Sequence, residues 1–105
     1  MRAIGTHNYF VYILTNFNKT VLYTGVTNCL RNRLFEHRTD AENERKHFTG
    51  KYNVIYLVYW ERFTNIEDAI SREKQIKGWT RIKKENLILE FNSEWKFLND
   101  EIEDF

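Results

Sequence analysis

Two tyrosines, an arginine, a histidine and a glutamate are spaced along the sequence so that they could act on a phosphate ester. Tyr12 and Tyr23 lie in two apolar stretches, and Arg33, His37 and Glu73 follow downstream. Phenol and imidazole groups can exchange protons, a guanidinium binds phosphate oxygens through paired hydrogen bonds, and a carboxylate can hold a divalent cation. These residue types predict metal-assisted chemistry on a phosphate, provided that the fold brings them together.

Each of these residues also has an ordinary structural interpretation. A tyrosine in a strand commonly serves packing, and an inward histidine is commonly satisfied within a core. Glu73 with Arg33 could be a plain structural salt bridge. The choice between these interpretations depends on the elements that position the side chains.

A β-hairpin and a third strand are predicted from the apolar runs. Tyr9 to Leu14 and Val21 to Thr24 are rich in aromatic and β-branched residues and enclose the turn-rich segment Thr15 to Lys19, which is typical of a hairpin. Val54 to Trp60 is a continuous apolar run, as expected of a central strand covered on both faces. Gly25 ends the second strand at a place where another group could approach the backbone closely.

A short helix should follow the hairpin. Asn28 is the expected N-cap, the helix should end near Arg38, and a polar loop should run from Thr39 to about Lys51. Helical spacing places an arginine and a histidine on the same inward side as two leucines. These inward positions are Leu30, Arg33, Leu34 and His37.

A second helix places a carboxylate on its apolar stripe. Thr64 or Asn65 can cap this helix, which should end near Gly78. At about 100° per residue, Glu73 falls between Ala69 and Ile66 on the helix circumference. An ionised carboxylate facing a core is unfavourable by several kcal/mol unless it is paired, protonated or bound to a cation. Glu73 therefore needs a partner. The full stripe is Ile66, Ala69, Ile70 and Ile76.

The remaining elements and the charge distribution suggest a basic body and an acidic end. A helix is predicted from Arg81 to Phe91, and a short helix from Ser93 to about Leu98 whose acidic end frays. Residues 85–105 hold seven acids and one base, and since the whole chain carries +1, residues 1–84 carry +7. That charge suits a polyanion, although a solvated surface would give the same pattern. The basic residues that could follow a phosphate backbone are Arg72, Lys74, Lys77, Arg81, Lys83 and Lys84.

Length and composition predict one small globular domain, and the predicted strands and helices make it an α/β domain. We assign a core to about residues 9–98 of the 105 residues (12.9 kDa) and an acidic tail to about residues 99–105. The lone cysteine, Cys29, cannot form an internal disulfide or a multi-thiolate zinc site. No run approaches the ~18 apolar residues of a membrane span or the pattern of a signal peptide, so we expect a cytoplasmic protein. The tryptophans expected to pack in the core are Trp60, Trp79 and Trp95.

Two short motifs on the predicted hairpin resemble a known signature. Val11-Tyr12-Ile13 and Tyr23-Thr24-Gly25 resemble the two halves of the GIY-YIG nuclease signature. Arg33-Leu34-Phe35-Glu36-His37 and the segment from Ala69 to Trp79 follow in the family's order. The chain is similar, from about Tyr9 to Leu98, to the small single-domain branch related to the N-terminal nuclease domain of the excision-repair nuclease.

The resemblance implies a fold and a function. The fold would be a small antiparallel three-stranded sheet flanked by helices, and the function would be hydrolysis of DNA phosphodiester bonds in repair or recombination with one divalent metal, Mg²⁺ or Mn²⁺. By position, Glu73 would be the metal ligand, Arg33 would bind the scissile phosphate, and Tyr23 would activate the attacking water. Tyr12 and His37 would lie beside them.

The sequence also departs from the family's pattern. The first motif reads Val-Tyr-Ile where the family has Gly-Ile-Tyr, and Val26 stands where the repair nucleases have a lysine. Their active-site asparagine corresponds to Asn86, to Asn92 or to no residue here. An alternative is therefore a non-catalytic nucleic-acid-binding module that acts through a partner protein, and a third is a purely structural protein with a Glu73–Arg33 pair.

Overall fold

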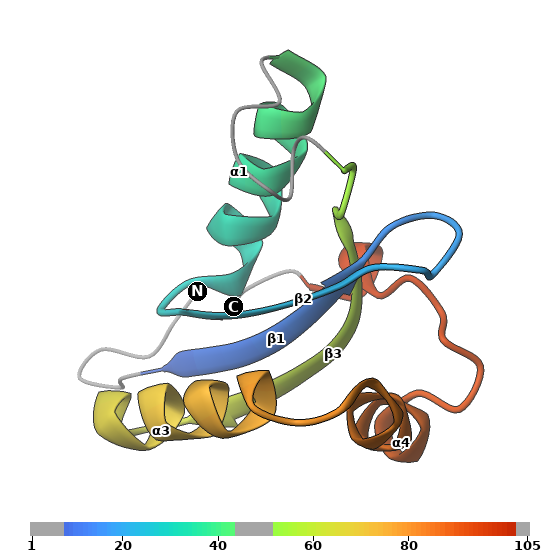
Figure 1. Cartoon of the computed structure of the whole chain (residues 1–105). Helices are drawn as coiled ribbons and strands as arrows, with labels where there is room; N and C mark the ends of the chain where they lie inside the picture. Colours follow the sequence, from blue (N-terminus) through green and yellow to red (C-terminus); the bar gives the residue numbers. More distant parts are fainter. Residues whose placement is uncertain (1–7, 44–51, 103–105) are drawn as a thin grey trace.

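The centre of the computed structural model, which describes residues 8–43 and 52–102, is a three-stranded antiparallel sheet (Figure 1). The strands are β1 (Tyr9–Thr15), β2 (Leu22–Thr27) and β3 (Tyr56–Phe63), in the order β2-β1-β3. The predicted hairpin and the three-stranded sheet are confirmed. The prediction of a central third strand is wrong, because β1 pairs with both neighbours and β3 lies at an edge. The run in β3 is apolar because Leu57 and Val58 are buried on opposite faces.

The first helix, α1 (Leu30–Asn43), is longer than the sequence predicts. It begins after Cys29, whose carbonyl accepts a hydrogen bond from the Arg33 amide at 3.1 Å, one residue later than the predicted Asn28 cap. The predicted loop is wrong for residues 39–43, since Ala41 is buried one heptad after Leu34 and continues the apolar side of the helix. The remainder of that loop, 44–51, lies outside the described residues.

The two following helices agree with their predicted limits. In α3 (Ile66–Lys77) the side chain of Asn65 accepts a hydrogen bond from the Glu67 amide at 2.7 Å, and Gly78 is the C-cap. In α4 (Arg81–Phe91) the Thr80 hydroxyl accepts from the Lys83 amide. The buried stripe of α3 is narrower than predicted. Ala69 and Ile76 are fully buried, whereas Ile66 and Ile70 are 41% and 37% exposed.

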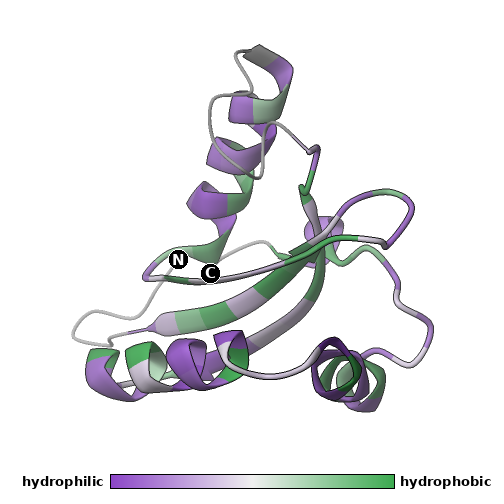
Figure 2. Ribbon diagram, in the orientation of Figure 1, coloured by the Kyte–Doolittle hydropathy of each residue, from purple (hydrophilic) through white to green (hydrophobic). Residues whose placement is uncertain are grey.

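Helices cover the two faces of the sheet separately (Figure 1). Because alternate residues of a strand point to opposite faces, β1 contributes to two separate cores. In Figure 2 the hydrophobic residues concentrate on the strands, and α1 is largely hydrophilic. The core on the α1 face contains Phe10, Tyr12, Leu14, Leu30, Leu34, Val54, Leu57, Leu98 and Ile102. The core on the face of α3 and α4 contains Val11, Ile13, Val58, Tyr59, Ala69, Ile76 and Ile88.

The C-terminal segment packs against the sheet beyond the predicted end of the core. The predicted helix over 93–98 is wrong, and the segment is irregular until a short 3₁₀ turn, η1 (Asn99–Glu101). The Asn99 amide side chain accepts from the Leu57 amide at 2.8 Å and donates to the Ile55 carbonyl at 2.9 Å. Ile102 is buried. The stretch to Ile102 is therefore docked rather than frayed. In the described part of the chain, no helix is both long and apolar enough to cross a bilayer.

Candidate active site

The phenol of Tyr12 is the centre of a polar cluster on the α1 face of the sheet. Its oxygen lies 3.0 Å from His37 Nε2 and accepts a hydrogen bond from Arg33 Nε at 3.4 Å. The Tyr23 ring lies 6.4 Å from the Tyr12 ring and 5.7 Å from the His37 ring. The structure thus brings together four of the five residues that the sequence predicts to be catalytic. We call these four, Tyr12, Tyr23, Arg33 and His37, the tyrosine cluster.

The geometry of the hairpin explains why this cluster forms. Tyr12 pairs with Gly25 across the strands, and a Cβ at position 25 would lie 2.5 Å from both Cζ and the oxygen of Tyr12. The absence of a side chain at Gly25 therefore makes room for the Tyr12 phenol. The predicted close approach is confirmed, although Gly25 lies inside β2 rather than at its end. Arg33 and His37 are one turn apart on α1, so that both reach the same phenol.

Burial and charge divide the cluster into a buried part and an accessible part. Burial raises the pKa of Tyr12 to about 12, and the hydrogen bond from Arg33 acts in the opposite direction. The same hydrogen bond raises the pKa of Arg33. Tyr12 is fully buried, whereas Tyr23 is half-buried and the Arg33 side chain is 41% exposed. Tyr12 is therefore a neutral group that orients its neighbours, and Arg33 and Tyr23 can reach a substrate.

Glu73 lies on α3, which packs against the opposite face of the sheet. Its side chain is 14% exposed, and its Oε2 lies 2.7 Å from Lys77 Nζ. The prediction that this acid needs a partner is confirmed, and the partner is Lys77. The alternative Glu73–Arg33 salt bridge is not formed, because Arg33 pairs with Glu36 at 3.4 Å. Among the described residues, Glu73 forms no hydrogen bond with the tyrosine cluster.

Sequence reasoning missed both ion-pair partners, Glu36 and Lys77. Each lies three or four residues from the residue it pairs with, a spacing that brings helical side chains together and that could have identified them.

The donor set is compatible with a divalent cation that is completed by substrate. No group of three or more His, Cys, Asp or Glu side chains that could hold a metal occurs over residues 8–43 and 52–102. Mg²⁺ binds through one or two carboxylates plus water and phosphate oxygens, so a single carboxylate is sufficient when a phosphate is present. The Glu73 carboxylate is paired with the Lys77 ammonium at 2.7 Å. Glu73 can therefore take the role of a lone metal ligand when that ammonium moves aside.

Two of the predicted phosphate-binding residues are engaged within the fold. The Arg72 guanidinium donates to Glu61 Oε2 at 3.2 Å and lies over the Trp79 ring. The Arg81 guanidinium donates to Glu85 and to the carbonyls of Lys19 and Thr20, at 2.8, 2.8 and 2.7 Å. These arginines join α3 to β3 and α4 to the hairpin turn.

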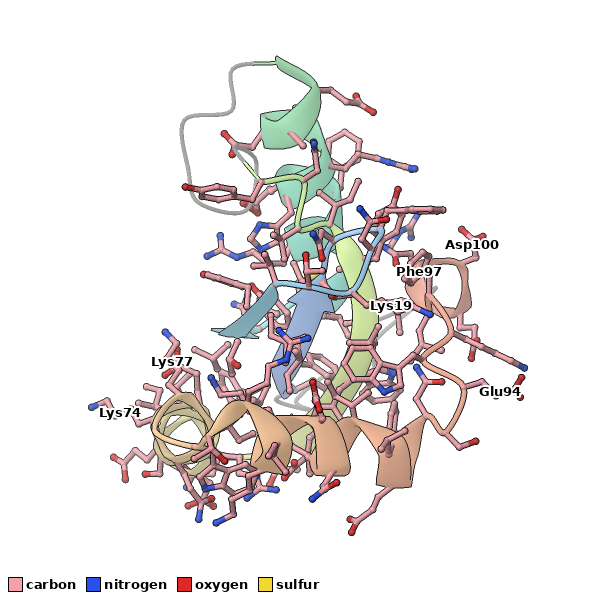
Figure 3. All side chains as sticks on the ribbon, turned by 45° about the vertical axis from the view of Figure 1, so that its right-hand side comes forward. Lys19, Lys74, Lys77, Glu94, Phe97 and Asp100 are labelled. Carbon is pink, nitrogen blue, oxygen red and sulfur yellow. The ribbon has the colours of Figure 1, made fainter. Side chains whose placement is uncertain are left out.

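The predicted lysines differ in their surroundings. Lys74 and Lys77 project outward from α3 (Figure 3), and Lys83 lies over the Trp79 ring at 4.5 Å from its centroid. Lys84 is half-buried on α4. The six predicted residues thus do not form one uniform basic face. Lys74 and Lys83 are both exposed and without an ion pair among the described residues, and of these two Lys83 lies against a tryptophan ring.

The two candidate asparagines also differ. Asn92 is buried, donates to the carbonyls of Val58 and Lys96 at 3.1 and 2.9 Å, and accepts from the Lys96 amide. Its side chain is fully used in fastening the C-terminal segment. Asn86 is exposed on α4.

The three tryptophans pack against the two cores as predicted.

Comparisons with known proteins identify the family. The model of the GIY-YIG catalytic domain matches residues 8–86. The UPF0213 protein of Natronomonas pharaonis is 38% identical over 81 residues, which cover 77% of this chain and 91% of that protein. The UPF0213 protein of Clostridium perfringens is 39% identical over 79 residues, covering 75% and 81%. The solution NMR structure of a UPF0213 protein from Bacillus halodurans has a TM-score of 0.47 at 30% identity and covers 77% and 82%. The chain therefore belongs to the GIY-YIG family, a superfamily of nuclease domains, as its two tyrosine motifs predict.

Proposed function

We propose that this protein is an endonuclease that hydrolyses DNA phosphodiester bonds with the help of a divalent metal. The observation that carries the proposal is the convergence of Arg33, Tyr23 and His37 around the buried phenol of Tyr12. A guanidinium can bind a phosphate, and a partly exposed tyrosine in its phenolate form can accept a proton from water. The resemblance to the excision-repair nuclease supports a role in DNA repair or recombination.

Arg33 would bind the scissile phosphate. Its Nε is held by the Tyr12 oxygen, so the planar guanidinium has a fixed direction before the substrate arrives. Its terminal nitrogens can then form paired hydrogen bonds to phosphate oxygens and offset the charge that develops in the transition state. The ion pair with Glu36 is solvent-exposed and can be exchanged at small cost.

Tyr23 would accept the proton of the attacking water. A phenol is a weak base at neutral pH, so a cation has to stabilise its phenolate form. Arg33 is the cation of the tyrosine cluster, and both Arg33 and Tyr23 adjoin the Tyr12 phenol. His37 holds the other side of Tyr12 and packs edge-on against Tyr23, which fixes the relative positions of the two rings.

Glu73 would hold the metal, Mg²⁺ or Mn²⁺. Nucleases of this family generally use divalent metal ions. When bound, the ion polarises the phosphate and acidifies its water ligands. Exposed lysines of α3 and α4 would add contacts to the DNA backbone, and such contacts give affinity without reading sequence.

The test compares the wild type with Glu73→Gln on a panel of labelled DNA: plain duplex, nicked duplex and branched forms, with Mg²⁺ or Mn²⁺. The matched control is Glu67→Gln, which changes an exposed acid in the first turn of the same helix. We expect cleavage by the wild type and by Glu67→Gln, and loss of cleavage in Glu73→Gln with the fold intact. Equal cleavage by Glu73→Gln and the wild type would contradict the assignment.

A non-catalytic DNA-binding module is the second candidate. It is favoured by Val26 in place of the family's lysine and by the engagement of Glu73 with Lys77. Such a module would bind DNA with an affinity that falls steeply with salt, because binding releases counterions. It would not respond to Mg²⁺ or Mn²⁺, would give no products, and would need a partner protein for activity.

A further inference from the structure

The ion pair between Glu73 and Lys77 occupies the position on α3 where the proposed function requires a metal ligand. Glu73 Oε2 and Lys77 Nζ are 2.7 Å apart, with side chains that are 14% and 51% exposed. The two residues are one helical turn apart with the acid nearer the N-terminus, which is the favourable order for such a pair. The acid is thus the sheltered partner and the base is the accessible one.

The environment of Glu73 explains why it keeps a counter-charge. Ala69 precedes it by four residues and Ile76 follows it by three, so both adjoin it on the helix surface, and both are fully buried. A carboxylate at the margin of an apolar core loses much of its hydration and needs a nearby positive charge. The Lys77 ammonium supplies this charge in the metal-free protein.

A divalent cation at the same carboxylate would compete with that ammonium. Two positive charges at one carboxylate repel each other strongly where water is partly excluded. The lysine side chain is long, flexible and half-exposed, so it can move into solvent without disturbing the helix.

We infer that Lys77 is the resident counter-ion of Glu73, and that a divalent cation binds this carboxylate only by displacing the Lys77 ammonium. The inference rests on the proposed role of Glu73 as the metal ligand. Its consequence is that Lys77 weakens metal binding in the absence of DNA. The released ammonium would then be available to a DNA phosphate on the same side of the helix.

Lys74 provides a matched control for Lys77. Both lysines belong to α3 and project outward from the molecule (Figure 3), but Lys74 forms no ion pair among the described residues. Replacing either lysine by methionine removes one positive charge from the same helix and keeps a long, unbranched side chain. The difference between the two variants therefore isolates the contact with Glu73 from the general effect of charge, which salt at about 0.15 M largely screens.

The experiment measures Mn²⁺ binding to the DNA-free protein by calorimetry or by the electron paramagnetic resonance of free Mn²⁺. Breaking a partly exposed ion pair costs about 1 kcal/mol or less, so we expect Lys77→Met to bind Mn²⁺ about threefold to fivefold more tightly than the wild type. Lys74→Met should differ from the wild type by less than about twofold. Equal affinities of the two variants, or weaker binding by Lys77→Met, would overturn the inference.

Glu73→Gln separates failure of the inference from failure of the proposed function. If Glu73→Gln binds Mn²⁺ like the wild type, Glu73 is not the ligand, and the proposed function loses its metal site. If Glu73→Gln abolishes binding while Lys77→Met and Lys74→Met behave alike, only the role of Lys77 is wrong.

Thermal unfolding provides a second readout that does not depend on activity. Without metal, Lys77→Met should melt below the wild type because Glu73 loses its counter-ion, and Mn²⁺ should raise its melting temperature more than it raises that of the wild type. Lys77→Gln, which keeps a hydrogen-bond donor, repeats the test in case the methionine variant does not fold. A Mn²⁺-induced shift no larger in Lys77→Gln than in the wild type would again contradict the inference.

Discussion

The two faces of the sheet hold their polar side chains by different means. On the α1 face, hydrogen bonds and ring contacts gather the tyrosine cluster around one buried, neutral phenol. On the α3 face, charged side chains are neutralised in pairs, Glu73 with Lys77 and Arg72 with Glu61. The side chains of the α1 face are therefore held in place by contacts with one another, whereas a metal ion proposed to bind Glu73 on the α3 face would have to displace Lys77.

The two ion pairs of the α3 face also differ from each other. The Glu73–Lys77 pair lies within one helix, so it can open without separating elements of the fold. The Arg72–Glu61 pair joins α3 to β3, and Glu61 also accepts a hydrogen bond from Tyr59. That contact and burial raise the pKa of Tyr59, burial being the larger cause. We therefore assign exchangeable charge to Lys77 and a structural role to Arg72.

The largest effect that we expect from the α1 face follows the loss of its guanidinium. Arg33→Ala should lower the single-turnover rate of DNA cleavage by about 10²–10³, because one preorganised donor to the transition-state charge is lost. Arg38→Ala is the matched control, since the Arg38 side chain is 68% exposed on the same helix and its Nε lies 4.0 Å from Glu42 Oε1. An equal loss of rate in the two variants would show that general positive charge on α1, rather than the arrangement around Tyr12, sustains cleavage.

The next effect tests the fit between the hairpin and Tyr12. Gly25→Ala would place a methyl group 2.5 Å from the Tyr12 phenol and should lower the free energy of unfolding by about 1–3 kcal/mol. Gly78→Ala is the control. Its Cβ would be 3.5 Å from the nearest atom, and φ is −80°, so we expect no destabilisation. Urea unfolding measures the free energy of unfolding of both variants. If the two variants are equally stable, the phenol is not confined by Gly25.

The same comparison shows which features the sequence could predict. The tyrosine cluster was predictable because each of its members is placed by a strong local periodicity: Tyr12 and Tyr23 by the hairpin, and Arg33 and His37 by one turn of α1. The cap at Asn65, one of the two predicted candidates, was predictable because a cap depends on a few neighbouring residues.

Features that depend on distant contacts were less predictable. The central position predicted for the third strand was wrong because a continuous apolar run shows that both faces are buried but does not show which edges are paired. The docking of Leu98 to Ile102 was missed because it depends on hydrogen bonds from Asn99 to residues 55 and 57, more than forty positions away. We expected Glu73 to lie near the tyrosine cluster because Glu73 and Arg33 both point from their helices towards the sheet. The two helices cover opposite faces of the sheet, so pointing towards the sheet does not bring these side chains together.

A smaller effect should follow the removal of the central hydroxyl. Tyr12→Phe keeps the ring and removes the oxygen that contacts Arg33 and His37. We expect a loss of about 1–2 kcal/mol in the free energy of unfolding and about tenfold in cleavage rate, because two polar partners lose a buried contact. Tyr56→Phe is the control, since its ring stacks on Phe97 at 4.2 Å and that contact survives. A similar loss in both variants would contradict the central position of Tyr12.

The smallest effect is a change in alkaline stability that only the buried phenol should produce. The pKa of Tyr12 is raised to about 12, above the value of about 10 in the unfolded chain, so the unfolded chain loses its proton first as the pH rises. The contribution of Tyr12 to the free energy of unfolding is therefore fully present below pH 10 and is lost as the pH rises towards 12. For Tyr12 alone the loss between pH 9 and 10.5 is about 0.8 kcal/mol. Tyr59, whose pKa is also raised, adds a loss in the same direction.

Urea unfolding at pH 9 and at pH 10.5 measures this decline in the free energy of unfolding. The decline should be smaller for Tyr12→Phe than for the wild type, and Tyr56→Phe should decline as much as the wild type. An identical decline in all three proteins would mean that the Tyr12 hydroxyl is solvated, and that the α1 face is no more preorganised than the α3 face.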